Sequence, residues 1–463
     1  MENFIKESGL APDPSIMKTY ADDFDNEMIK GLRGEDSSLM MLPTFISYEG
    51  ASGSGDVAAS AIGGSGDAAA GAIGASGDVP ATSGNAIVVD AGGTNLRIAL
   101  VTLGGAAPEI KYFEKYPIPG FKVSVTAEEF FGKLAEYIEP IAAESDKIGF
   151  CFSNPAEILP SRDARIIKFT KEVKVSGSGG VIIGDALRDA LKARGLPHRK
   201  HIVVLNDTVA TQLGAMADVS ERGKYGGYIG MILGTGLNAS YAEKNENIKK
   251  NKLLCDLPGA TLVNIEAGGY RGFPRGKVDA QFIEATIDPG IHWLEKMTAG
   301  AYQCGMLLEW IRFAGANGHF SRTFSDRLAE LRLIPVGEAD RFYFRDEDRS
   351  AGGDVLSKLC ADAADAEKLR LLIKAFFERI SFMIATMLTG IMFRMNESAK
   401  DSLRPICISV EGSTFYNARL LRPSLENYMR EYTCNQFGLH YHFVKIEDAT
   451  ILGSALAGLA GNR

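Results

Sequence analysis

Two patterns of apolar and polar positions alternate along this chain. Short apolar runs that end in polar residues lie at 147–153 and 201–207, as in buried parallel strands whose ends face a binding site. Longer amphipathic stretches predict helices between and after these strands. The helical stretches are residues 127–143, 179–194, 208–219 and 448–460. This alternation of strands and helices predicts an α/β fold.

One longer apolar segment predicts a buried helix. Between residues 369 and 380, apolar side chains recur at helical spacing with charged residues between them. The uncharged run from Ile380 to Phe393 is shorter than the roughly 20 residues that a membrane helix needs. The N-terminal stretch MENFIKESGL has no apolar centre of signal-peptide length. We therefore expect a core helix and no membrane span.

The stretch IVVDAGGTNLR, residues 87–97, predicts two strands joined by a turn at Gly92 and Gly93. Adjacent glycines let a backbone turn sharply and bring its N–H groups against an anion, here the phosphates of a nucleotide. No Gly-Lys-Ser/Thr follows, so the turn is not a helix-opening P-loop. Asp90, at the strand end, can hold Mg²⁺ through water. The other side chains that can contact a phosphate here are those of Thr94, Asn95 and Arg97.

Alone, this segment is equally well interpreted as a hairpin with a tight turn, in which Arg97 pairs with an acidic neighbour. Two further strands run into glycine turns, at 229–243 and 406–414. Three such turns with hydroxyl residues at the bend fit one nucleotide held between two halves of a molecule. The bends consist of Gly234, Thr235 and Gly236, and of Gly412, Ser413 and Thr414.

Composition adds a few limits. With 463 residues, the chain is long enough for two domains or one large domain with insertions. A formal net charge of −8 argues against nucleic acid as a general partner, whereas ATP needs only local donors and a metal. The six cysteines are spaced singly, which indicates reduced thiols in a cytoplasmic protein. The histidines predict no catalytic role; His440 and His442 fit one face of a half-exposed strand better than a metal site.

Seven segments, in order along the chain, resemble the motifs of hexokinases, which are ATP-dependent sugar kinases of the actin, Hsp70 and sugar-kinase superfamily. They are SSLMMLPTFI (37–46), DAGGTNLR (90–97), LNDTVAT (205–211), LGTGLNASY (233–241), NIEAGGY (264–270), DPGIHWLEKMTAGAY (288–302) and EGSTFYNARLLRP (411–423). Single motifs are shared across the superfamily, but the combination with NDT and PGxxxxEKM is specific to hexokinases. The resemblance implies a two-lobed, actin-like ATPase fold of the ribonuclease H-like type, with a cleft between a large and a small domain.

The same resemblance implies the domain boundaries. The large domain comprises residues 1–49 and 208–447, and the small domain comprises residues 81–207 and 448–463. Between them lies a Gly/Ala/Ser-rich segment, residues 50–80, in which Ser54, Ser65 and Ser76 mark a repeat. Such a composition cannot bury enough apolar surface to offset chain entropy, so we expect a flexible insert rather than a stacked repeat with a binding role.

Asp207 is the candidate catalytic base. Transfer of a phosphoryl group to a sugar hydroxyl needs an acceptor for the hydroxyl proton, and a carboxylate at a strand end can serve. In hexokinases the aspartate of the NDT motif has this role, so the resemblance assigns it to Asp207. The alternative is that Asp207 caps the helix that comes next in the chain.

The resemblance also implies a set of sugar contacts whose carboxylates, amides, hydroxyls and ammonium group would pair with the hydroxyls of the ring. The set consists of Ser153, Thr170, Lys171, Asn206, Asp207, Asn238, Glu266 and Glu295. Glu266 and Glu295 would accept hydrogen bonds from neighbouring hydroxyls, and Lys171 would steer the acceptor oxygen or the developing charge. Each has a plainer alternative, such as a solvated Lys171 or a Glu295 paired with a lysine on its helix.

Four residues depart from the family pattern. Asn154 replaces the phenylalanine of Ser-Phe-Pro, Glu172 the glycine after Thr-Lys, and Ala267 the tryptophan of Glu-Trp-Gly. Glu411 replaces the strand-end aspartate of the adenosine motif. These changes affect the expected specificity and affinity for sugar more than the expected reaction.

The activity implied is transfer of the γ-phosphoryl group of Mg-ATP to the 6-hydroxyl of a hexose, as in the first step of glycolysis. Glucose is the first candidate, and mannose, fructose or a hexosamine are others; the oligomeric state stays open. A second hypothesis is a sugar sensor that does not turn over, and a third is an actin-like or chaperone-like ATPase. The presence of Asp207 and Lys171 speaks against the sensor, and the sugar-contact set has no use in the ATPase.

Overall fold

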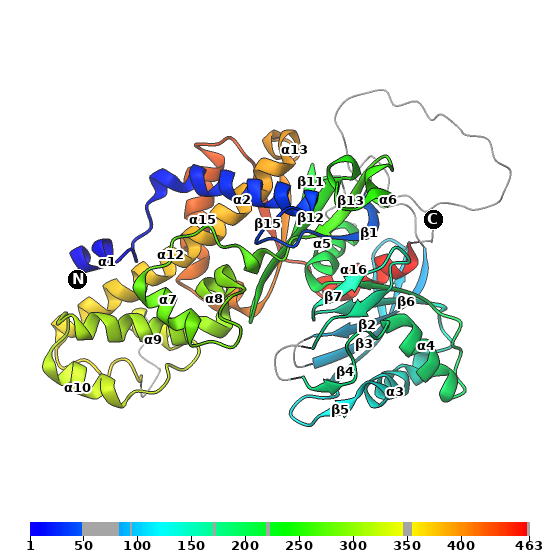
Figure 1. The fold of residues 1–463 in the computed structure, drawn as a ribbon, viewed down its shortest axis with the longest axis horizontal. Helices are drawn as coiled ribbons and strands as arrows, with labels where there is room; N and C mark the ends of the chain where they lie inside the picture. Colours follow the sequence, from blue (N-terminus) through cyan, green and yellow to red (C-terminus); the bar gives the residue numbers. More distant parts are fainter. Residues whose placement is uncertain (49–82, 93–94, 170–172, 219–222, 346–353, 461–463) are drawn as a thin grey trace.

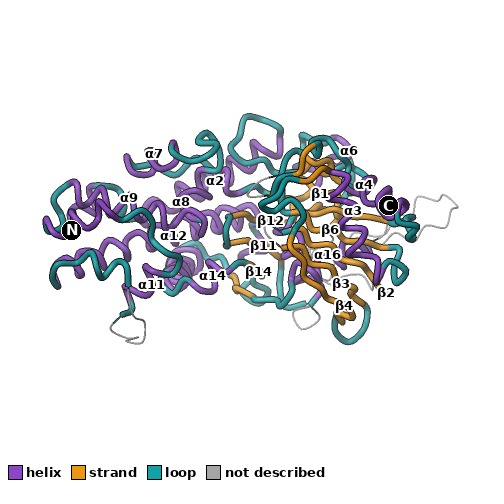
Figure 2. The backbone as a smooth tube through the Cα atoms, turned by 90° about the horizontal axis from the view of Figure 1, so that it is seen from below, coloured by secondary structure: helices purple, strands orange, loops and turns teal. Residues whose placement is uncertain are grey.

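The computed structural model describes residues 1–48, 83–92, 95–169, 173–218, 223–345 and 354–460. The predicted insert at 50–80 lies outside these residues. Two separate sheets dominate the architecture, one in each half of the molecule (Figure 1). A helical end that carries the N-terminus extends from one of them (Figure 2). The α/β prediction is confirmed.

The larger sheet has six strands in the order β1-β13-β12-β11-β14-β15. Their bounds are Leu42–Tyr48, Ala260–Asn264, Leu237–Lys244, Gly227–Leu233, Ile406–Glu411 and Tyr441–Val444. Strands β11 and β12 form an antiparallel hairpin, whereas β11, β14 and β15 run parallel. The two predicted strand-to-glycine turns of this region therefore lie side by side, at the C-terminal ends of the neighbouring strands β11 and β14. His442 lies within the edge strand β15, and His440 immediately precedes it.

The smaller sheet has five strands in the order β10-β6-β2-β3-β4. Their bounds are His201–Leu205, Lys147–Phe152, Gly84–Ala91, Asn95–Leu103 and Glu109–Pro117. Strands β10, β6 and β2 are parallel, as the apolar runs predict, and β2–β3 is an antiparallel hairpin around the first glycine turn. The short strands of this half are β5 (Val125–Thr126), β7 (Ala156–Ile158), β8 (Ala164–Ile166) and β9 (Val175–Ser176).

Two helices, α5 (Asp207–Ala217) and α16 (Ala449–Leu459), lie between the sheets (Figure 1). Glycines allow their backbones to meet: a Cβ added at Gly214 or Gly453 would overlap the carbonyl oxygen of Ala449 or Ala210. One buried apolar cluster includes both helices and residues from both sheets, such as Val88 and Cys407. This helix pair therefore forms the connection between the two halves.

Helices surround the larger sheet and form the helical end. The longest, α12 (Ala363–Met395), has 33 residues and confirms the predicted core helix; it packs against α2 (Met17–Arg33) and α15 (Leu421–Tyr428). The other helices of this half are α1 (Glu2–Glu7), α6 (Lys252–Cys255), α7 (Lys277–Glu284), α8 (Trp293–Thr298), α9 (Gly300–Ala316), α10 (Arg322–Glu330), α11 (Glu338–Tyr343), α13 (Glu397–Lys400) and α14 (Ser413–Asn417). None of the helices in the described ranges is long and apolar enough to span a bilayer.

The predicted helix boundaries need two corrections. The helix expected over 127–143 is α3 (Ala127–Ile138), succeeded by a 3₁₀ turn at Glu139–Ile141 that contains Pro140, a residue that cannot continue the helical hydrogen bonds. The helix expected from 179 is α4 (Ile183–Ala193), because Gly180 has a positive φ of 84°. Glycine in that conformation breaks the helical path.

Candidate functional site

The turns after β11 and β14 contact one another directly. The Gly412 backbone has φ 122°, and a Cβ added there would overlap the Leu233 carbonyl group and lie 2.7 Å from the Gly234 nitrogen. A Cβ at Gly234 would lie 3.3 Å from the Gly412 Cα. Only glycine allows two turns to approach this closely, so the pair forms one continuous backbone surface.

The start of α9 and the hydroxyl of Thr414 hold this double turn. Thr414 Oγ1 and the Gly300 N–H both donate to the Gly234 carbonyl, each at 2.9 Å. The Ala301 N–H donates to the Thr235 carbonyl at 3.2 Å. The residues predicted to contact a nucleotide at 234–236 and 412–414 are thus brought together in space.

The first glycine turn belongs to the other sheet. Gly92 donates its N–H to the Asn95 carbonyl at 3.1 Å and closes the β2–β3 hairpin, whereas the predicted contacts Gly93 and Thr94 lie outside the described residues. At the end of β2, an Asp90 carboxylate oxygen lies 3.3 Å from Arg97 Nη1. Arg97 therefore pairs with an acidic neighbour, which was the plainer of its two interpretations.

Asp90 is buried and has two further hydrogen-bond partners, the side chains of Cys151 and Thr450. Thr450 Oγ1, at the start of α16, donates to Asp90 at 3.1 Å. Burial raises the pKa of Asp90. The charge of Arg97 and the hydrogen bonds from Cys151 and Thr450 lower it, and the charge of Asp207 raises it further. The site therefore places two carboxylates near one another, with Arg97 beside them.

Asp207 does not cap α5. The capping residue is Asn206, whose side-chain oxygen accepts hydrogen bonds from the Thr208 N–H at 2.9 Å and from Thr208 Oγ1 at 2.6 Å. Asp207 occupies the first position inside the helix, and no described residue donates a hydrogen bond to its carboxylate. The capping hypothesis for Asp207 is wrong, because its neighbour already satisfies the helix end.

The charge of Asp207 affects acidic residues in both halves of the molecule. Burial is the main cause of the raised pKa values of Asp90 and Glu266, and in both the charge of Asp207 raises the pKa further. Asp90 ends β2 of the smaller sheet, whereas Glu266 comes after β13 of the larger one. The Asp207 carboxylate is therefore within electrostatic reach of an acidic residue in each half of the molecule.

Glu266 is held by a pair of asparagines. Its Oε1 accepts from Asn264 Nδ2 at 2.8 Å and from Asn238 Nδ2 at 3.5 Å. Asn238 Oδ1 in turn accepts from the Ala267 N–H at 3.1 Å. Glu266 has φ 57°, an uncommon conformation for a residue other than glycine, and the surrounding hydrogen bonds maintain it. The group is therefore fixed in one orientation.

Glu295 extends this polar group from α8. Its Oε2 accepts from the Leu237 N–H at 3.1 Å, directly after the Gly236 turn. A Cβ added at Gly236 would lie 2.7 Å from that oxygen, and one at Gly268 would lie 2.9 Å from the Glu295 Cβ. Two glycines thus make room for one carboxylate, so Glu295 joins the second nucleotide turn to the Glu266 group.

For the remaining predicted sugar contacts, the structure gives fewer side-chain interactions or none. Ser153 comes after β6, and its N–H donates to the Ala91 carbonyl at 3.3 Å, next to the Asp90 strand end. The oxygen of Asn206 serves the helix cap, which leaves its amide nitrogen as a donor. Thr170 and Lys171 lie outside the described residues, as does Glu172.

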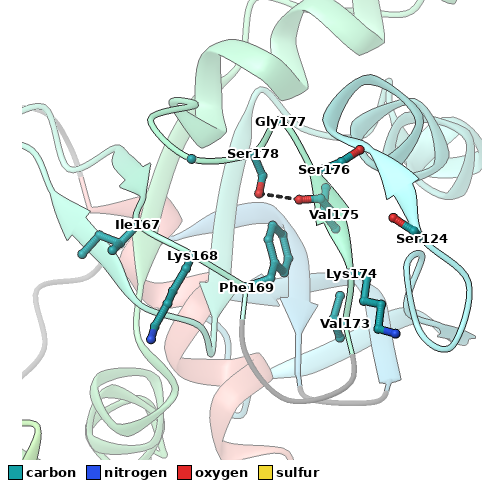
Figure 3. A pocket seen from close by; sticks show the side chains of 11 residues that line it. Ser124, Ile167, Lys168, Phe169, Val173, Lys174, Val175, Ser176, Gly177 and Ser178 are labelled. Atoms are coloured by element: carbon teal, nitrogen blue, oxygen red, sulfur yellow. Dashed lines mark hydrogen bonds between the residues drawn. The ribbon is translucent and has the colours of Figure 1, made fainter. Parts of the chain in front are cut away.

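The segments on either side of 170–172 line a hollow of about 440 Å³ in the smaller half (Figure 3). Phe169 points into it and Lys168 lies at its side, while Ser178 Oγ donates to the Val175 carbonyl at 2.8 Å (Figure 3). Lys168 also reaches across to the larger half, where its Nζ lies 3.6 Å from an Asp288 carboxylate oxygen. Lys168, a described residue of the smaller half, therefore pairs with a carboxylate of the larger half.

Three residues of the site were not predicted from sequence. Asn264 lies within the NIEAGGY segment, and its position two residues before Glu266 could have indicated that the two side chains lie close together. His292 lies close enough to Glu266 for each to affect the pKa of the other; burial lowers the pKa of His292 and Glu266 opposes that fall. Thr450 carries no sequence signal, because its partner Asp90 is 360 positions away.

The charges present fit a magnesium–nucleotide complex. Burial raises the pKa of Glu411, Asp90 raises it further, and Arg97 opposes the rise. Glu411, Asp90 and Asp207 would together repel an uncomplexed polyphosphate, whereas a divalent cation offsets their charge. The described residues contain no cluster of three or more metal-ligating side chains. Mg²⁺ held by one carboxylate, waters and phosphates needs no such cluster.

The fold and this arrangement define a class, the two-lobed sugar kinases. The structure aligns with the hexokinase from Schistosoma mansoni complexed with glucose, at a TM-score of 0.73 and 21% identity over 99% of this chain and 98% of that one. Sequence models described as Hexokinase match residues 77–217 and 228–460.

Two curated relatives show the range of similarity. Hexokinase-4, chloroplastic, from Oryza sativa subsp. japonica is 26% identical over 81% of this chain and 77% of that protein. Hexokinase-like 1 protein from Arabidopsis thaliana is 33% identical over 46% of this chain and 45% of that protein. The chain belongs to the hexokinase family, a family of sugar kinases that generally use ATP with Mg²⁺.

Proposed function

We propose that this protein transfers the γ-phosphoryl group of Mg-ATP to the 6-hydroxyl of a hexose, with glucose as the first candidate, and that it serves the first step of glycolysis. One observation carries the proposal. Asp207, which neither caps its helix nor accepts a hydrogen bond from a described residue, lies within electrostatic reach of both Asp90, beside the first glycine turn, and Glu266. A free carboxylate in that position can accept the proton of a sugar hydroxyl.

The other residues have binding roles in this proposal. The turns at Gly92, Gly234 and Gly412 hold the nucleotide, which when bound with Mg²⁺ supplies the phosphoryl group. Asn238, Glu266 and Glu295 orient the sugar, together with Ser153, Asn206 and Thr170, the last of which lies outside the described residues. Lys171 steers the acceptor oxygen. Closure of the lobes excludes water, which otherwise competes with the sugar as acceptor.

The direct test is ADP release from Mg-ATP by the purified protein, without sugar and then with glucose, mannose, fructose, glucosamine or N-acetylglucosamine. We expect release only when a sugar is present, with glucose giving the highest rate. Release without sugar would instead indicate an ATPase. Thermal stabilisation by a sugar without any release would support the sensor hypothesis. We place the activity in the cytoplasm on the single spacing of the six cysteines, which cell fractionation can test.

We expect sugar binding to depend on pH through Glu266. Its pKa is raised above the ordinary 4.5, mainly by burial. A carboxylate that accepts hydrogen bonds from sugar hydroxyls must be ionised, so the affinity for sugar should fall as the pH falls through this raised pKa. The apoprotein should respond in the opposite way: since the folded state holds the proton more tightly, ionisation of Glu266 lowers the free energy of unfolding as the pH rises through the same interval.

Calorimetric titration with sugar at a series of pH values tests this expectation. Glu266→Gln should bind sugar more weakly and lose the pH dependence. Glu397→Gln, at an exposed position on α13, is the matched control and should retain it. An unchanged pH profile in Glu266→Gln would exclude Glu266 as its source.

A further inference from the structure

The turn that precedes α8 is held by three side chains that bond to three successive carbonyl groups. Lys296 Nζ donates to the Asp288 carbonyl at 2.6 Å and Trp293 Nε1 donates to the Pro289 carbonyl at 3.1 Å. Arg271 Nη2 donates to the Gly290 carbonyl at 2.8 Å. Few exposed turns have a separate side-chain donor for each consecutive carbonyl, because most such carbonyls bond to water.

Burial of apolar side chains does not hold this turn. Ile287 and Ile291, on either side of the three carbonyls, are 90% and 37% exposed. The backbone also has positive φ angles at Asp288 (54°) and His292 (57°), which residues other than glycine rarely adopt without support. The three hydrogen bonds therefore supply the support that packing does not.

Trp293 is itself fixed. The guanidinium carbon of Arg275 lies 3.2 Å from the centroid of its indole ring, and that of Arg271 lies 5.3 Å from it. Cation–π contacts of this kind hold a ring in one orientation. Arg271 thus makes two interactions, a cation–π contact with the Trp293 ring and a hydrogen bond to the Gly290 carbonyl.

The held turn leads directly into the proposed sugar site. His292, at its end, is within electrostatic reach of Glu266, and Glu295 lies three positions later. On its other side, the Asp288 carboxylate faces Lys168 of the smaller half at 3.6 Å. A displacement of this turn would therefore move Glu295 relative to Glu266.

We propose that Trp293 and Arg271 are positioning residues for sugar binding, acting by holding the turn at 288–290 so that Glu295 and the Glu266 group keep their spacing. This inference rests on the proposed function. Neither side chain needs to touch the sugar. Their loss should weaken sugar binding and loosen the turn, with little effect on ATP binding.

The chain offers a matched pair of variants, because it contains only two tryptophans, Trp293 and Trp310. Trp293→Phe retains an aromatic ring beside the arginines but removes the donor to the Pro289 carbonyl. Trp310→Phe makes the same chemical change in the core, where Nε1 has no hydrogen-bond partner among the described residues. Arg271→Leu is a second variant at an exposed position, and Arg271→Lys, which retains a donor, should restore part of the affinity.

Three measurements are needed: hydrogen exchange of residues 286–292 in the apoprotein, calorimetric sugar affinity, and steady-state kinetics with the sugar that gives the highest ADP release. For Trp293→Phe and Arg271→Leu we expect faster exchange in the turn and sugar affinity weaker by about 5- to 10-fold, the effect of losing one such hydrogen bond. The KM for ATP should be unchanged. Trp310→Phe should show neither effect, and its remaining tryptophan emission, from Trp293 alone, should change on sugar binding.

Two different results would overturn the inference, and only one of them would also overturn the proposed function. Normal sugar affinity in Trp293→Phe and Arg271→Leu, beside normal binding by the unaltered protein, would remove the positioning role and leave the proposed function intact. Failure of the unaltered protein to bind any sugar of the panel would overturn the proposed function, and the positioning role with it.

Discussion

Asp207→Ala should bind sugar nearly as well as the unaltered protein but turn over about 10²- to 10⁴-fold more slowly, the usual contribution of a general base. The carboxylate accepts no hydrogen bond from a described residue, and Asn206 supplies the helix cap, so its removal leaves the fold supported. Removing the charge of Asp207 also removes its repulsion of the Glu266 carboxylate, whose pKa is raised mainly by burial and further by Asp207. Sugar affinity should therefore change little. Calorimetry for binding and ADP release for turnover measure the two quantities separately.

Two companion variants make this result specific. Asp207→Asn, which retains the shape of the side chain, should lose turnover to a similar extent. Asp189→Asn removes an exposed carboxylate from α4 of the same half and should leave turnover unchanged. Near-normal turnover in Asp207→Ala would exclude Asp207 as the base, whereas joint loss of sugar binding and turnover would indicate a binding role instead.

Gly412→Ala should weaken ATP binding severely and lower stability. The backbone at Gly412 has φ 122°, and an added Cβ would overlap the Leu233 carbonyl group and approach the Gly234 nitrogen at 2.7 Å. The obstacle is backbone, which cannot rotate away as a flexible side chain does. We expect a loss of about 3 kcal/mol in stability from the combined strain and overlap. The two glycine turns would separate, so the KM for ATP should rise by about tenfold or more, whereas sugar affinity should fall much less.

Gly438→Ala is the control for backbone conformation alone. Gly438 also has a positive φ, 67°, but an added Cβ would meet nothing within 4 Å. Its substitution should cost about 1 kcal/mol and leave the KM for ATP unchanged. Denaturation curves and ADP-release kinetics on both variants give the comparison. Equal KM values for ATP in Gly412→Ala and Gly438→Ala would exclude a role of the paired turns in nucleotide binding.

Much of the site was accessible from local sequence. Each of the three glycine turns comes after a strand of apolar residues, and the structure confirms a strand before each one. The third turn differs from the other two in the element that it leads into, because Ser413 begins the short helix α14 rather than a second strand. The hydroxyl residue at that bend, Thr414, bonds to the Gly234 carbonyl, a contact that no local pattern could predict.

The choice between Asn206 and Asp207 shows where sequence reasoning stops. Both residue types favour helix N-termini, so sequence alone leaves either as the cap. Which of the two caps the helix depends on backbone conformation. Asn206 has an extended backbone and its side chain bonds to Thr208, whereas Asp207 is already helical. The consequence for function is large, because only the residue that does not cap is free to act as a base.

The strands, the glycine bends and the core helix could be predicted from the sequence, because these features depend on residues close together in the chain. The tertiary structure, in contrast, determines which polar groups meet. It brings Asp90 to Thr450 and Arg97, sets the Asp207 carboxylate within electrostatic reach of an acidic residue in each half of the molecule, and surrounds Glu266 with two asparagines. It also assembles the donors that hold the turn at 288–290 from separate segments. Such contacts arise when distant segments pack together, and their energy depends on burial and distance, which composition and spacing along the chain do not record.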